Sequence, residues 1–592
     1  MVRAPGSKRA NTASKNTANA NQANRDEENA TRRFAKDMGL IVETSQDPYR
    51  ARDYKSASPA HAHGAGFTFV MHPYGWLVAA VLLAVILKAI LLAANAVPFN
   101  SDEAVVALMA RHILQGARPV FFYGQSYMGS LDAWLAAAAF RILGEGVLPV
   151  RLVQVGLYMG YLFSLWLLAR SLFTDRLPAT LAVFLGAVPV VLVTTYTTAS
   201  LGGYGETLVL GNLILWLGYE IAYGKRQESY WAWLVFGLVA GLAFWTLALS
   251  LVYLLPVGIL IVRRYWAGAN RRLFLGVILF LAGWVVGSLP WWYANLSGGW
   301  QALRVLLGSS VIKTTFIERL TALLLLGLPA LAGMRFPWSG ELSPLPVIFV
   351  YIVLYLAAGF VLLRGARRGS LPLAPGAGWL LGSFAGCFVL IFLLTRYGID
   401  ATGRYLLPLS TLLVLAMALF ISIVWRHRRA WGMILLLCTL ALNGMETARA
   451  AASPEGITTQ FDPITRFDNR YDNALIDFLR QNGELRGYSN YWVSYKMAFL
   501  SGEELIYAAR LPYKPDLSYS PGDNRIPSYS QQADGSLRVA YITSLHTRLD
   551  EILGRELRSL GVTFNERQIG PYHVFYNLSR PVRPEELKYE AE

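Results

Sequence analysis

The stretch YGWLVAAVLLAVILKAILLAANAV, residues 74–97, decides the fold, because it is an apolar run long enough to cross a bilayer. A membrane helix needs about 20 residues of this kind. The chain then turns polar at Asn100-Ser101-Asp102-Glu103, and residues 104–116 predict a short amphipathic helix rather than a loop. Carboxylates are costly near hydrocarbon, so two of them at the mouth of a first span need an explanation.

The composition is that of a polytopic membrane protein. Hydrophobic residues make up 54% of the chain and charged residues 15%, and the 17 Trp and 31 Tyr suit membrane–water interfaces. The net charge of +15 comes largely from basic clusters that flank apolar runs, as cytoplasmic loops do. These clusters are Arg263-Arg264, Arg271-Arg272, Arg364 with Arg367-Arg368, and Arg426 with Arg428-Arg429. We therefore expect a lipid bilayer, and no nucleic acid, as a partner.

Ten further apolar runs predict membrane spans, which with residues 74–97 makes eleven. They lie near residues 148–170, 178–196, 205–223, 229–246, 247–262, 273–289, 345–363, 378–394, 406–424 and 430–447. Two other apolar stretches are too short to cross. Residues 321–334 are interrupted by Gly327 and Pro329, and residues 130–143 predict an interfacial helix. The apolar face of that interfacial helix comprises Leu131, Trp134, Leu135, Ala138 and Ile142.

The positive-inside rule orients these spans. With the basic clusters in the cytoplasm, the outside segments are residues 97–147, 197–204, 290–344, 395–405 and everything after about 450. An odd number of spans sends the two ends of the chain to opposite sides. Because the first apolar run starts late, there is no signal-peptide layout, and we expect a multi-pass protein of the cell (plasma or inner) membrane.

The predicted organisation has three parts. Residues 1–72 are rich in small polar and basic residues and predict a disordered cytoplasmic tail. Residues 73–450 form an α-helical transmembrane domain, with residues 97–147 as its first outer loop. Residues 451–592 form a small extracytoplasmic α/β domain.

The pattern in the last part is mixed. Residues 471–481 and 549–560 have helical spacing, while residues 539–543 and 573–576 are typical of strands. Residues 512–534, rich in Pro, Ser, Gly and Tyr, predict a loop.

Two interpretations fit Ser101-Asp102-Glu103. Ser101 is a good N-cap, and acidic residues in a first turn complement the helix dipole, so a helix start alone accounts for them. The other interpretation is chemical, in which the two carboxylates take part in a reaction; a carboxylate pair alone suits a divalent metal such as Mg²⁺ or Mn²⁺ only loosely. No ligand spacing demands a metal, and both cysteines, Cys387 and Cys438, lie inside apolar runs, which argues against a disulfide or zinc site.

Two glycine- and tyrosine-rich segments predicted outside are candidates for substrate binding. Residues 121–129, FFYGQSYMG, offer Tyr123, Gln125 and Tyr127, whose rings and polar groups suit a sugar, although aromatic loops near a bilayer also serve as anchors. Between the third and fourth spans, GGYGE offers Tyr204 and Glu206. Glu206 either converges with Asp102 or caps the next helix.

A third outside segment, TRYGIDATGRY at residues 395–405, carries two arginines against the positive-inside trend. Arg396 and Arg404 suit a phosphate, because guanidinium groups give bidentate hydrogen bonds, and Tyr405 follows at the start of a span. The alternative is snorkelling, or pairing of Arg404 with Asp400. Lys313 is a weaker phosphate candidate.

At these residues the chain resembles the membrane glycosyltransferases of the GT-C fold, and most closely the protein O-mannosyltransferase and lipid A aminoarabinose transferase group. The likeness covers roughly residues 73–450. The matching residues are Asp102-Glu103, Ala110-Arg111, Gly116, Leu143-Gly144, Arg151-Leu152, Leu168-Ala169-Arg170 and Gly403-Arg404-Tyr405-Leu406-Leu407-Pro408. The second outer loop departs from the group, because Gly203-Tyr204-Gly205-Glu206 stands where an Asp with a nearby Arg is expected.

The resemblance implies an enzyme that takes a sugar from a polyprenyl-phosphate-linked donor and transfers it to an extracytoplasmic acceptor. Asp102 is then the catalytic carboxylate and general base, Glu103 beside it is a supporting or metal-binding group, and Arg404 lies in the lipid-phosphate region. Single displacement predicts inversion at the anomeric carbon. Two alternatives stay open: a transporter or lipid flippase of the cell-envelope glycan pathway, and a non-catalytic assembly or receptor protein. The sugar, the acceptor and any cofactor are not identified by the sequence.

Overall fold

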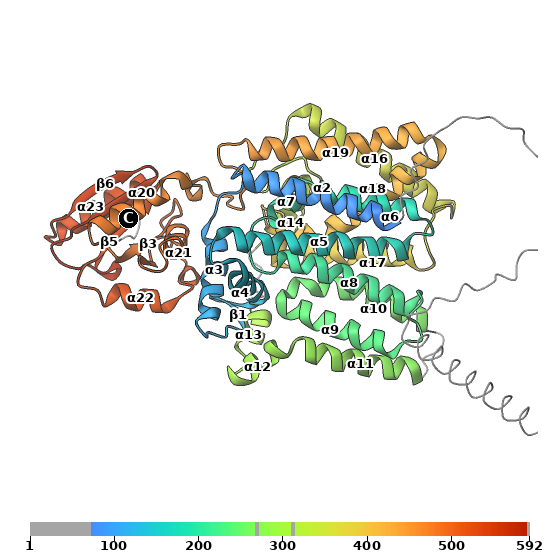
Figure 1. Cartoon of the computed structure of the whole chain (residues 1–592), viewed down its shortest axis with the longest axis horizontal. Coiled ribbons are helices and arrows are strands. Elements are labelled where there is room, and N and C mark those ends of the chain that lie inside the picture. The colour runs from blue at the N-terminus through green and yellow to red at the C-terminus, as the bar shows by residue number, and fades with distance from the viewer. Residues whose placement is uncertain (1–72, 267–270, 309–313, 589–592) are drawn as a thin grey trace, which may run out of the picture. The chain divides into compact units, whose positions relative to one another are not determined.

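A computed structural model describes residues 73–266, 271–308 and 314–588. The predicted tail and Lys313 lie outside these residues. Every one of the eleven predicted spans contains a helix, and these helices lie side by side (Figure 1). They are α2 (Pro73–Ala93), α5 (Val147–Leu172), α6 (Arg176–Ala187) with α7 (Val191–Tyr196), α8 (Tyr204–Ala222), α9 (Tyr230–Thr246), α10 (Leu251–Tyr265), α11 (Arg271–Gly287), α16 (Leu345–Arg367), α17 (Ala377–Leu394), α18 (Leu407–His427) and α19 (Arg429–Ala451).

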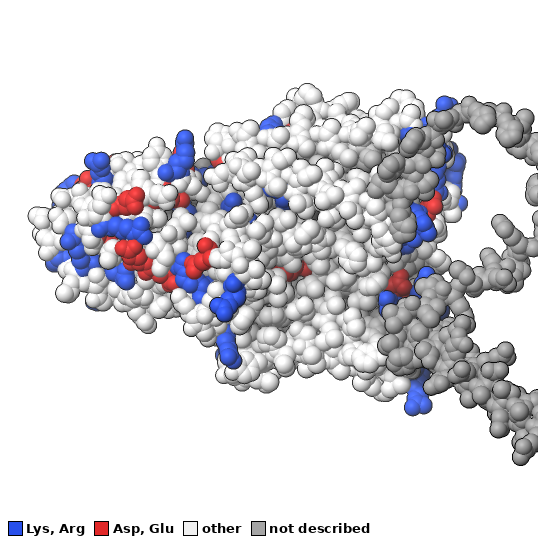
Figure 2. All heavy atoms as spheres, in the orientation of Figure 1, with Lys and Arg blue, Asp and Glu red and all other residues white. Residues whose placement is uncertain are grey.

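Length and composition qualify most of these helices as membrane spans. Among the described residues, seven helices are long and apolar enough to cross a membrane, or eight if α11 and α12 (Leu289–Ser297), which meet at a 65° bend, form one span. The others are shorter or carry more charge; α6 has 12 residues and α9 has 17. In Figure 2, charged side chains gather at the two ends of the helices, while the surface between them is almost uncharged. The predicted polytopic helical fold is confirmed.

One predicted span is broken. The sequence predicts a single helix over residues 178–196, but α6 ends at Ala187 and α7 begins at Val191. Pro189 lies in this gap, and proline lacks the N–H that a continuous helix would need there. α7 then ends at Tyr196, which precedes the loop that leads to α8.

Lys88 on α2 stabilises this broken region. It is 1% exposed, and its Nζ donates hydrogen bonds of 2.7 Å to the carbonyl and hydroxyl of Thr197 and to the hydroxyl of Thr198. Nζ also lies 4.4 Å from the ring centroid of Tyr158. A cation at the C-terminal end of α7 complements the helix dipole. Lys88 therefore faces a polar interior and does not snorkel.

Shorter elements lie between the spans. α4 (Leu131–Leu143) is the predicted interfacial helix. Its apolar face is exposed, with Trp134 40% and Ile142 80% exposed, and its opposite face buries Asp132 and Phe140. The remaining short elements are α3 (Ser101–Leu114), the hairpin β1 (Phe121–Phe122) and β2 (Gln125–Gly129), η1 (Ala248–Ser250), α13 (Gln301–Gly308), α14 (Phe316–Ala322), the π-helical turn η2 (Leu323–Gly327), α15 (Leu328–Leu331), η3 (Arg396–Ile399) and η4 (Arg404–Leu406).

The C-terminal part, which we call the sheet domain (residues 451–588), contains a five-stranded mixed sheet of order β4-β3-β5-β7-β6. β3 is parallel to β4 and β5, whereas β7 is antiparallel to β5 and β6. The strands are β3 (Arg486–Ser489), β4 (Ile506–Ala509), β5 (Ala540–Ser544), β6 (Asn565–Ile569) and β7 (Tyr572–Tyr576). The helices are α20 (Asp472–Gln481), α21 (Tyr491–Leu500), α22 (Pro527–Asp534) and α23 (Thr547–Ser559), with short turns η5 (Pro463–Thr465), η6 (Asn469–Tyr471), η7 (Pro521–Asp523) and η8 (Pro584–Glu586).

The sequence correctly predicts α20, α23, β5 and β7, but it misses the other strands and α21. It also assigns α22 to a loop. α21 is missed because eight of its ten residues are buried, so it lacks the one-sided apolar pattern that marks a surface helix.

Candidate active site

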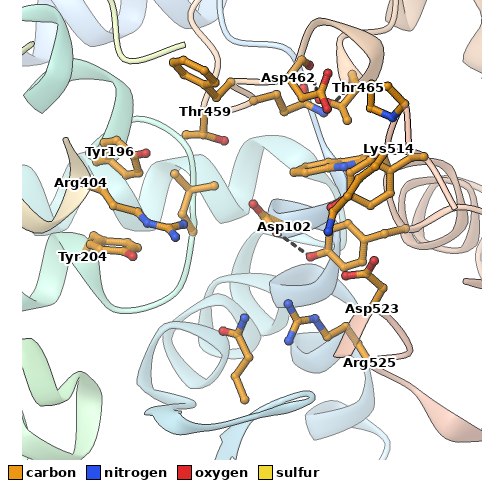
Figure 3. Close-up of a pocket in the computed structure, with 18 of the residues that line it drawn as sticks. Asp102, Tyr196, Tyr204, Arg404, Thr459, Asp462, Thr465, Lys514, Asp523 and Arg525 are labelled. Carbon is orange, nitrogen blue, oxygen red and sulfur yellow. Dashed lines mark hydrogen bonds between the residues drawn. The ribbon is translucent and has the colours of Figure 1, made fainter. Parts of the chain in front are cut away.

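A cavity of about 740 Å³ opens between loops at one end of the helices and the sheet domain. Its lining comes from segments far apart in the chain: α3, the β1–β2 hairpin, the loops around α7 and η4, and three stretches of the sheet domain (Figure 3). The lining residues are Asp102, Gln125, Tyr127, Tyr196, Leu201, Tyr204, Arg404, Thr459, Gln460, Phe461, Asp462, Thr465, Tyr491, Trp492, Tyr513, Lys514, Pro515, Asp516, Asp523 and Arg525.

Four of the five segments predicted outside therefore contribute to one cavity, at one end of the helices, whereas no described residue of 290–344 lines it. Five of the candidate residues line it: Asp102, Gln125, Tyr127, Tyr204 and Arg404. Four others do not line it: Glu103, Tyr123, Glu206 and Tyr405. Arg396 lies on η3, but its side chain is outside the described part of the structure, as is the whole of Lys313.

Asp102 occupies the first turn of α3. The N-cap of this helix is Asn100 and not the predicted Ser101, because the Asn100 side chain accepts a hydrogen bond of 3.2 Å from the Glu103 N–H. Asp102 projects into the cavity, and its Oδ1 accepts a hydrogen bond of 2.5 Å from the Tyr491 hydroxyl (Figure 3). The helix-start interpretation and the chemical interpretation are thus compatible, since a capped first turn fixes the Asp102 backbone.

Glu103 faces away from the cavity and is completely buried. Its two carboxylate oxygens accept hydrogen bonds of 3.1 and 3.0 Å from Nε and Nη2 of Arg151 on α5. Successive helical residues point about 100° apart, so a neighbour of Asp102 cannot share its direction. Among the residues that the structure describes, no group of three His, Cys, Asp or Glu side chains is placed to hold a metal ion. The geometry gives Glu103 a structural ion pair in place of the predicted catalytic or metal-binding role.

We expect Glu103→Gln to destabilise the protein by about 3–5 kcal/mol, because the Arg151 guanidinium would stay buried without a counter-charge. Thermal unfolding of the purified protein in detergent measures the loss. The matched control is Glu228→Gln, which breaks the exposed Arg272–Glu228 pair and should leave the melting temperature almost unchanged. Equal effects of the two substitutions would contradict this account of the buried pair.

Arg404 enters the cavity from the start of the Arg404–His427 span. Gly403 precedes it with φ +75°, a left-handed conformation that favours glycine. Figure 3 shows the guanidinium beside the rings of Tyr196 and Tyr204, pointing toward the space in front of Asp102. Its contact with Asp400 is long, 3.9 Å, and its Nε has no hydrogen-bond partner among the described residues. A guanidinium placed in this way can bind an anion that enters the cavity.

The loop between α7 and α8 forms another part of the wall. Gly202 and Gly203 have φ values of +78° and +79°, and a Cβ at Gly202 would meet the Met128 sulfur at 2.5 Å. Asp132 on α4 anchors this loop by accepting hydrogen bonds of 2.6 Å from the Ser200 hydroxyl and 3.2 Å from the Gly202 N–H. Burial raises the pKa of Asp132 to about 6, despite these hydrogen bonds.

Glu206 does not converge with Asp102. It is 2% exposed, lies behind the loop, and its two carboxylate oxygens have no hydrogen-bond partner among the described residues. Residues two apart on a helix point about 200° apart, so Tyr204 reaches the cavity from the first turn of α8 while Glu206 does not.

The candidate residues of the β1–β2 hairpin do not all reach the cavity. Gln125 and Tyr127 line the cavity, whereas the Tyr123 hydroxyl lies 3.1 Å from Nδ1 of His112. The guanidinium of Arg525 donates a hydrogen bond of 3.3 Å to the Gly124 carbonyl, which ties the hairpin to the sheet domain.

The sheet domain supplies a wall that the sequence does not predict. Figure 3 shows Lys514, Asp523 and Arg525 on the opposite side of Asp102 from Arg404. Aromatic rings of Tyr491, Trp492 and Tyr513 complete this wall. The Tyr-rich composition of residues 512–534 was the available signal, but nothing in the sequence alone places that segment against residue 102.

A polar cluster docks the sheet domain onto α3. Glu503 accepts one hydrogen bond of 2.6 Å from the Tyr529 hydroxyl. It also forms ion pairs with His112 at 2.9 Å and with Arg111 at 3.3 Å. Burial alone would raise the pKa of Glu503, but the hydrogen bonds with His112 and Tyr529 and the charges of His112 and Arg111 outweigh it and lower the pKa to about 2.

Docking is therefore expected to weaken in acid. The Glu503 pKa lies below its ordinary value of 4.5, so its stabilising contribution is complete above that pH and is lost as the pH falls through about 2. We expect Glu503→Gln to lower the melting temperature at pH 6, and the difference from wild type to shrink as the pH approaches 2.5. A difference that does not change with pH would refute the role of this carboxylate.

Comparisons with known proteins address the fold. No family model matches the sequence, and no curated protein matches it. Among solved structures, the chain is similar to ArnT from Cupriavidus metallidurans bound to undecaprenyl phosphate, with 13% identity over 85% of this chain and 98% of that chain and a TM-score of 0.54. It also matches the archaeal oligosaccharyltransferase AglB from Archaeoglobus fulgidus, in complex with an inhibitory peptide and a dolichol-phosphate, with 13% identity over 87% of this chain and 75% of that chain and a TM-score of 0.47.

Proposed function

We propose that this chain, which has the GT-C fold of membrane glycosyltransferases, transfers a sugar from a polyprenyl-phosphate-linked donor to an acceptor outside the cytoplasm. The predicted GT-C resemblance is confirmed at the level of the fold; membership of the mannosyltransferase-like group stays a prediction. The observation that carries the proposal is that Asp102 and Arg404 project into one cavity, which a sugar-sized ligand can enter.

The two residues have complementary tasks in a single displacement. The Asp102 carboxylate takes the proton of the acceptor hydroxyl, and the acceptor oxygen attacks the anomeric carbon. The bond between that carbon and the phosphate oxygen breaks, and polyprenyl phosphate leaves with the electron pair. The Arg404 guanidinium stabilises the negative charge that develops on the phosphate. Attack opposite the leaving group inverts the anomeric configuration.

The rest of the lining suits these substrates. Tyr127, Tyr204 and Tyr491 offer aromatic faces and hydroxyl groups, which contact the apolar faces and the hydroxyls of a sugar ring. Arg404 begins a membrane-spanning helix, so a phosphate beside it sits at the depth of lipid headgroups, with its prenyl chain in the bilayer. The solved neighbour ArnT, which is bound to undecaprenyl phosphate, supports this class of donor.

The orientation of the cavity follows from charge. The basic clusters lie at the end of the helices opposite the sheet domain, where Arg272 pairs with Glu228 and Arg426 with Asp175. Because such clusters stay in the cytoplasm, the cavity and the sheet domain face the other side of the membrane. An acceptor that reaches the cavity from outside the cell membrane fits this arrangement.

Transfer of label tests the proposal. The purified protein is incubated with radiolabelled polyprenyl-phosphate sugars and with cell-envelope acceptors, and the label is followed from the lipid to a water-soluble or acceptor-bound product. We expect transfer with at least one donor and release of polyprenyl phosphate. Label that stays on the lipid but crosses the bilayer of proteoliposomes would overturn the proposal in favour of a flippase.

A further inference from the structure

We propose that Tyr491 of the sheet domain is the positioning residue for Asp102, so that the site is complete only when the sheet domain is docked on α3. This inference rests on the proposed function, because it assumes that Asp102 is the base.

The hydrogen bond between the two side chains is the first support. The Tyr491 hydroxyl donates to Oδ1 of Asp102 at 2.5 Å, and no other hydrogen bond to the Asp102 side chain is formed within residues 73–266, 271–308 and 314–588. With Oδ1 held, the carboxylate cannot turn freely about its last side-chain bond. Oδ2 is left for the acceptor hydroxyl. A base fixed in this way keeps its reactive oxygen aimed into the cavity.

Tyr491 itself is rigidly held. It is 4% exposed and opens α21, whose N-cap Asn490 accepts hydrogen bonds of 3.0 and 3.2 Å from the N–H groups of Trp492 and Val493. Asn490 also donates a hydrogen bond of 2.9 Å to the Ser544 hydroxyl at the end of β5. The start of α21 is thus bound to the sheet, and these hydrogen bonds restrict the movement of the Tyr491 backbone.

The surroundings also keep the Tyr491 hydroxyl a donor. Burial, and then the charge of Asp102, raise the pKa of Tyr491 well above its ordinary value, so the hydroxyl is protonated at neutral pH. The Arg525 guanidinium lies 5.5 Å from the centroid of the Tyr491 ring, and the ring meets Tyr495 edge-on at 5.4 Å. These contacts hold the ring on both sides.

The docking of α21 against α3 fixes the register of the two residues. Asp102 meets Tyr491 where both helices begin. Near their far ends, Nη2 of Arg111 donates a hydrogen bond of 3.0 Å to the Phe499 carbonyl, and its guanidinium lies 4.9 Å from the Phe499 ring. These contacts are eight or nine residues apart on each helix, about 12–14 Å along the axes. Two helices that are joined near both ends and run in the same direction cannot slide past one another.

The test is the Tyr491→Phe variant, which removes the hydroxyl and keeps the ring. We expect kcat to fall about tenfold, the equivalent of one hydrogen bond to a charged group, with little change in the KM for the donor. We also expect the acid limb of the pH–rate profile to move to higher pH, because a carboxylate that loses its donor is protonated more easily. A merely structural defect would not move that limb.

The matched control is Tyr488→Phe. Tyr488 lies three residues earlier, on β3, and its buried hydroxyl donates a hydrogen bond of 2.7 Å to Asp534 within the sheet domain, away from the cavity. This variant loses the same kind of tyrosine–aspartate bond, and we expect its kcat and pH profile to equal those of the wild type.

Melting temperatures of Asp102→Ala, Tyr491→Phe and the double variant test the contact without reference to turnover, because each single substitution removes the hydrogen bond. Non-additive shifts are expected from residues in direct contact. Additive shifts, or a Tyr491→Phe variant with wild-type kcat and pH profile, would overturn the inference while leaving the proposed function intact. An inactive wild-type protein with non-additive shifts would overturn the proposed function, and with it the role of Tyr491.

Discussion

Asp102→Asn is expected to lower kcat for glycosyl transfer by about 10²–10⁴, the usual contribution of a general base. Asparagine has nearly the same shape as aspartate and can still accept the hydrogen bond from the Tyr491 hydroxyl. The fold and the binding of donor should therefore survive, while proton removal from the acceptor is lost. Steady-state transfer of labelled sugar measures the rate, and binding of labelled donor to the variant measures what is retained.

The matched control for this variant is Asp468→Asn. Asp468 is a carboxylate of the sheet domain that pairs with Arg470 and does not line the cavity. The Asp468→Asn variant should transfer sugar at the wild-type rate. If Asp102→Asn keeps more than a tenth of the wild-type kcat, Asp102 is not the base.

Arg404→Gln is expected to lower kcat by about 10²–10³, the range found when one donor to a developing anion is removed. The charge is lost where the phosphate leaves, so the effect should fall on kcat as well as on donor binding. Arg404→Lys should recover only part of the rate, because an ammonium keeps the charge but not the planar fork that binds two phosphate oxygens. Transfer rates of the three proteins at saturating donor give the comparison.

An arginine on the same end of the molecule provides the control. Arg470 is exposed and paired with Asp468, outside the cavity, so Arg470→Gln should leave transfer unchanged. A wild-type rate in Arg404→Gln, or equal losses in both variants, would show that Arg404 does not meet the leaving phosphate.

The membrane part of the fold was predictable because its pattern is one-dimensional. Apolar runs mark the helices, and the arginine clusters assign each connection to one end or the other. The positive-inside rule alone placed Asp102, Tyr204 and Arg404 at the same end of the helices, and in the structure they line one cavity. The break at Pro189 went unpredicted because the apolar run continues through it.

The direction of individual side chains was not predictable in the same way. Glu103 follows the cavity residue Asp102 directly and Glu206 lies two residues after Tyr204, yet each is turned by the helix into the protein interior. Glu103 is paired with Arg151, whose position on α5 depends on tertiary packing. Adjacency in sequence therefore overestimated the number of carboxylates at the site.

The contribution of the sheet domain was the largest omission. Tyr491, 389 residues after Asp102, and Arg525, farther still along the chain, reach the cavity through contacts that no local pattern encodes. β3 and α21 are short and buried on most sides, so they lack the alternation or one-sided stripe by which strands and helices are recognised. Only the three-dimensional structure connects this domain to the candidate chemistry.

The most direct test of the central claim is a structure of the Asp102→Asn protein with an intact polyprenyl-phosphate sugar, obtained by electron cryo-microscopy in lipid nanodiscs. We expect the phosphate at the Arg404 guanidinium and the anomeric carbon in the cavity, facing residue 102 and the Tyr491 hydroxyl. A donor bound elsewhere, or a phosphate turned away from Arg404 with the cavity empty, would contradict that claim.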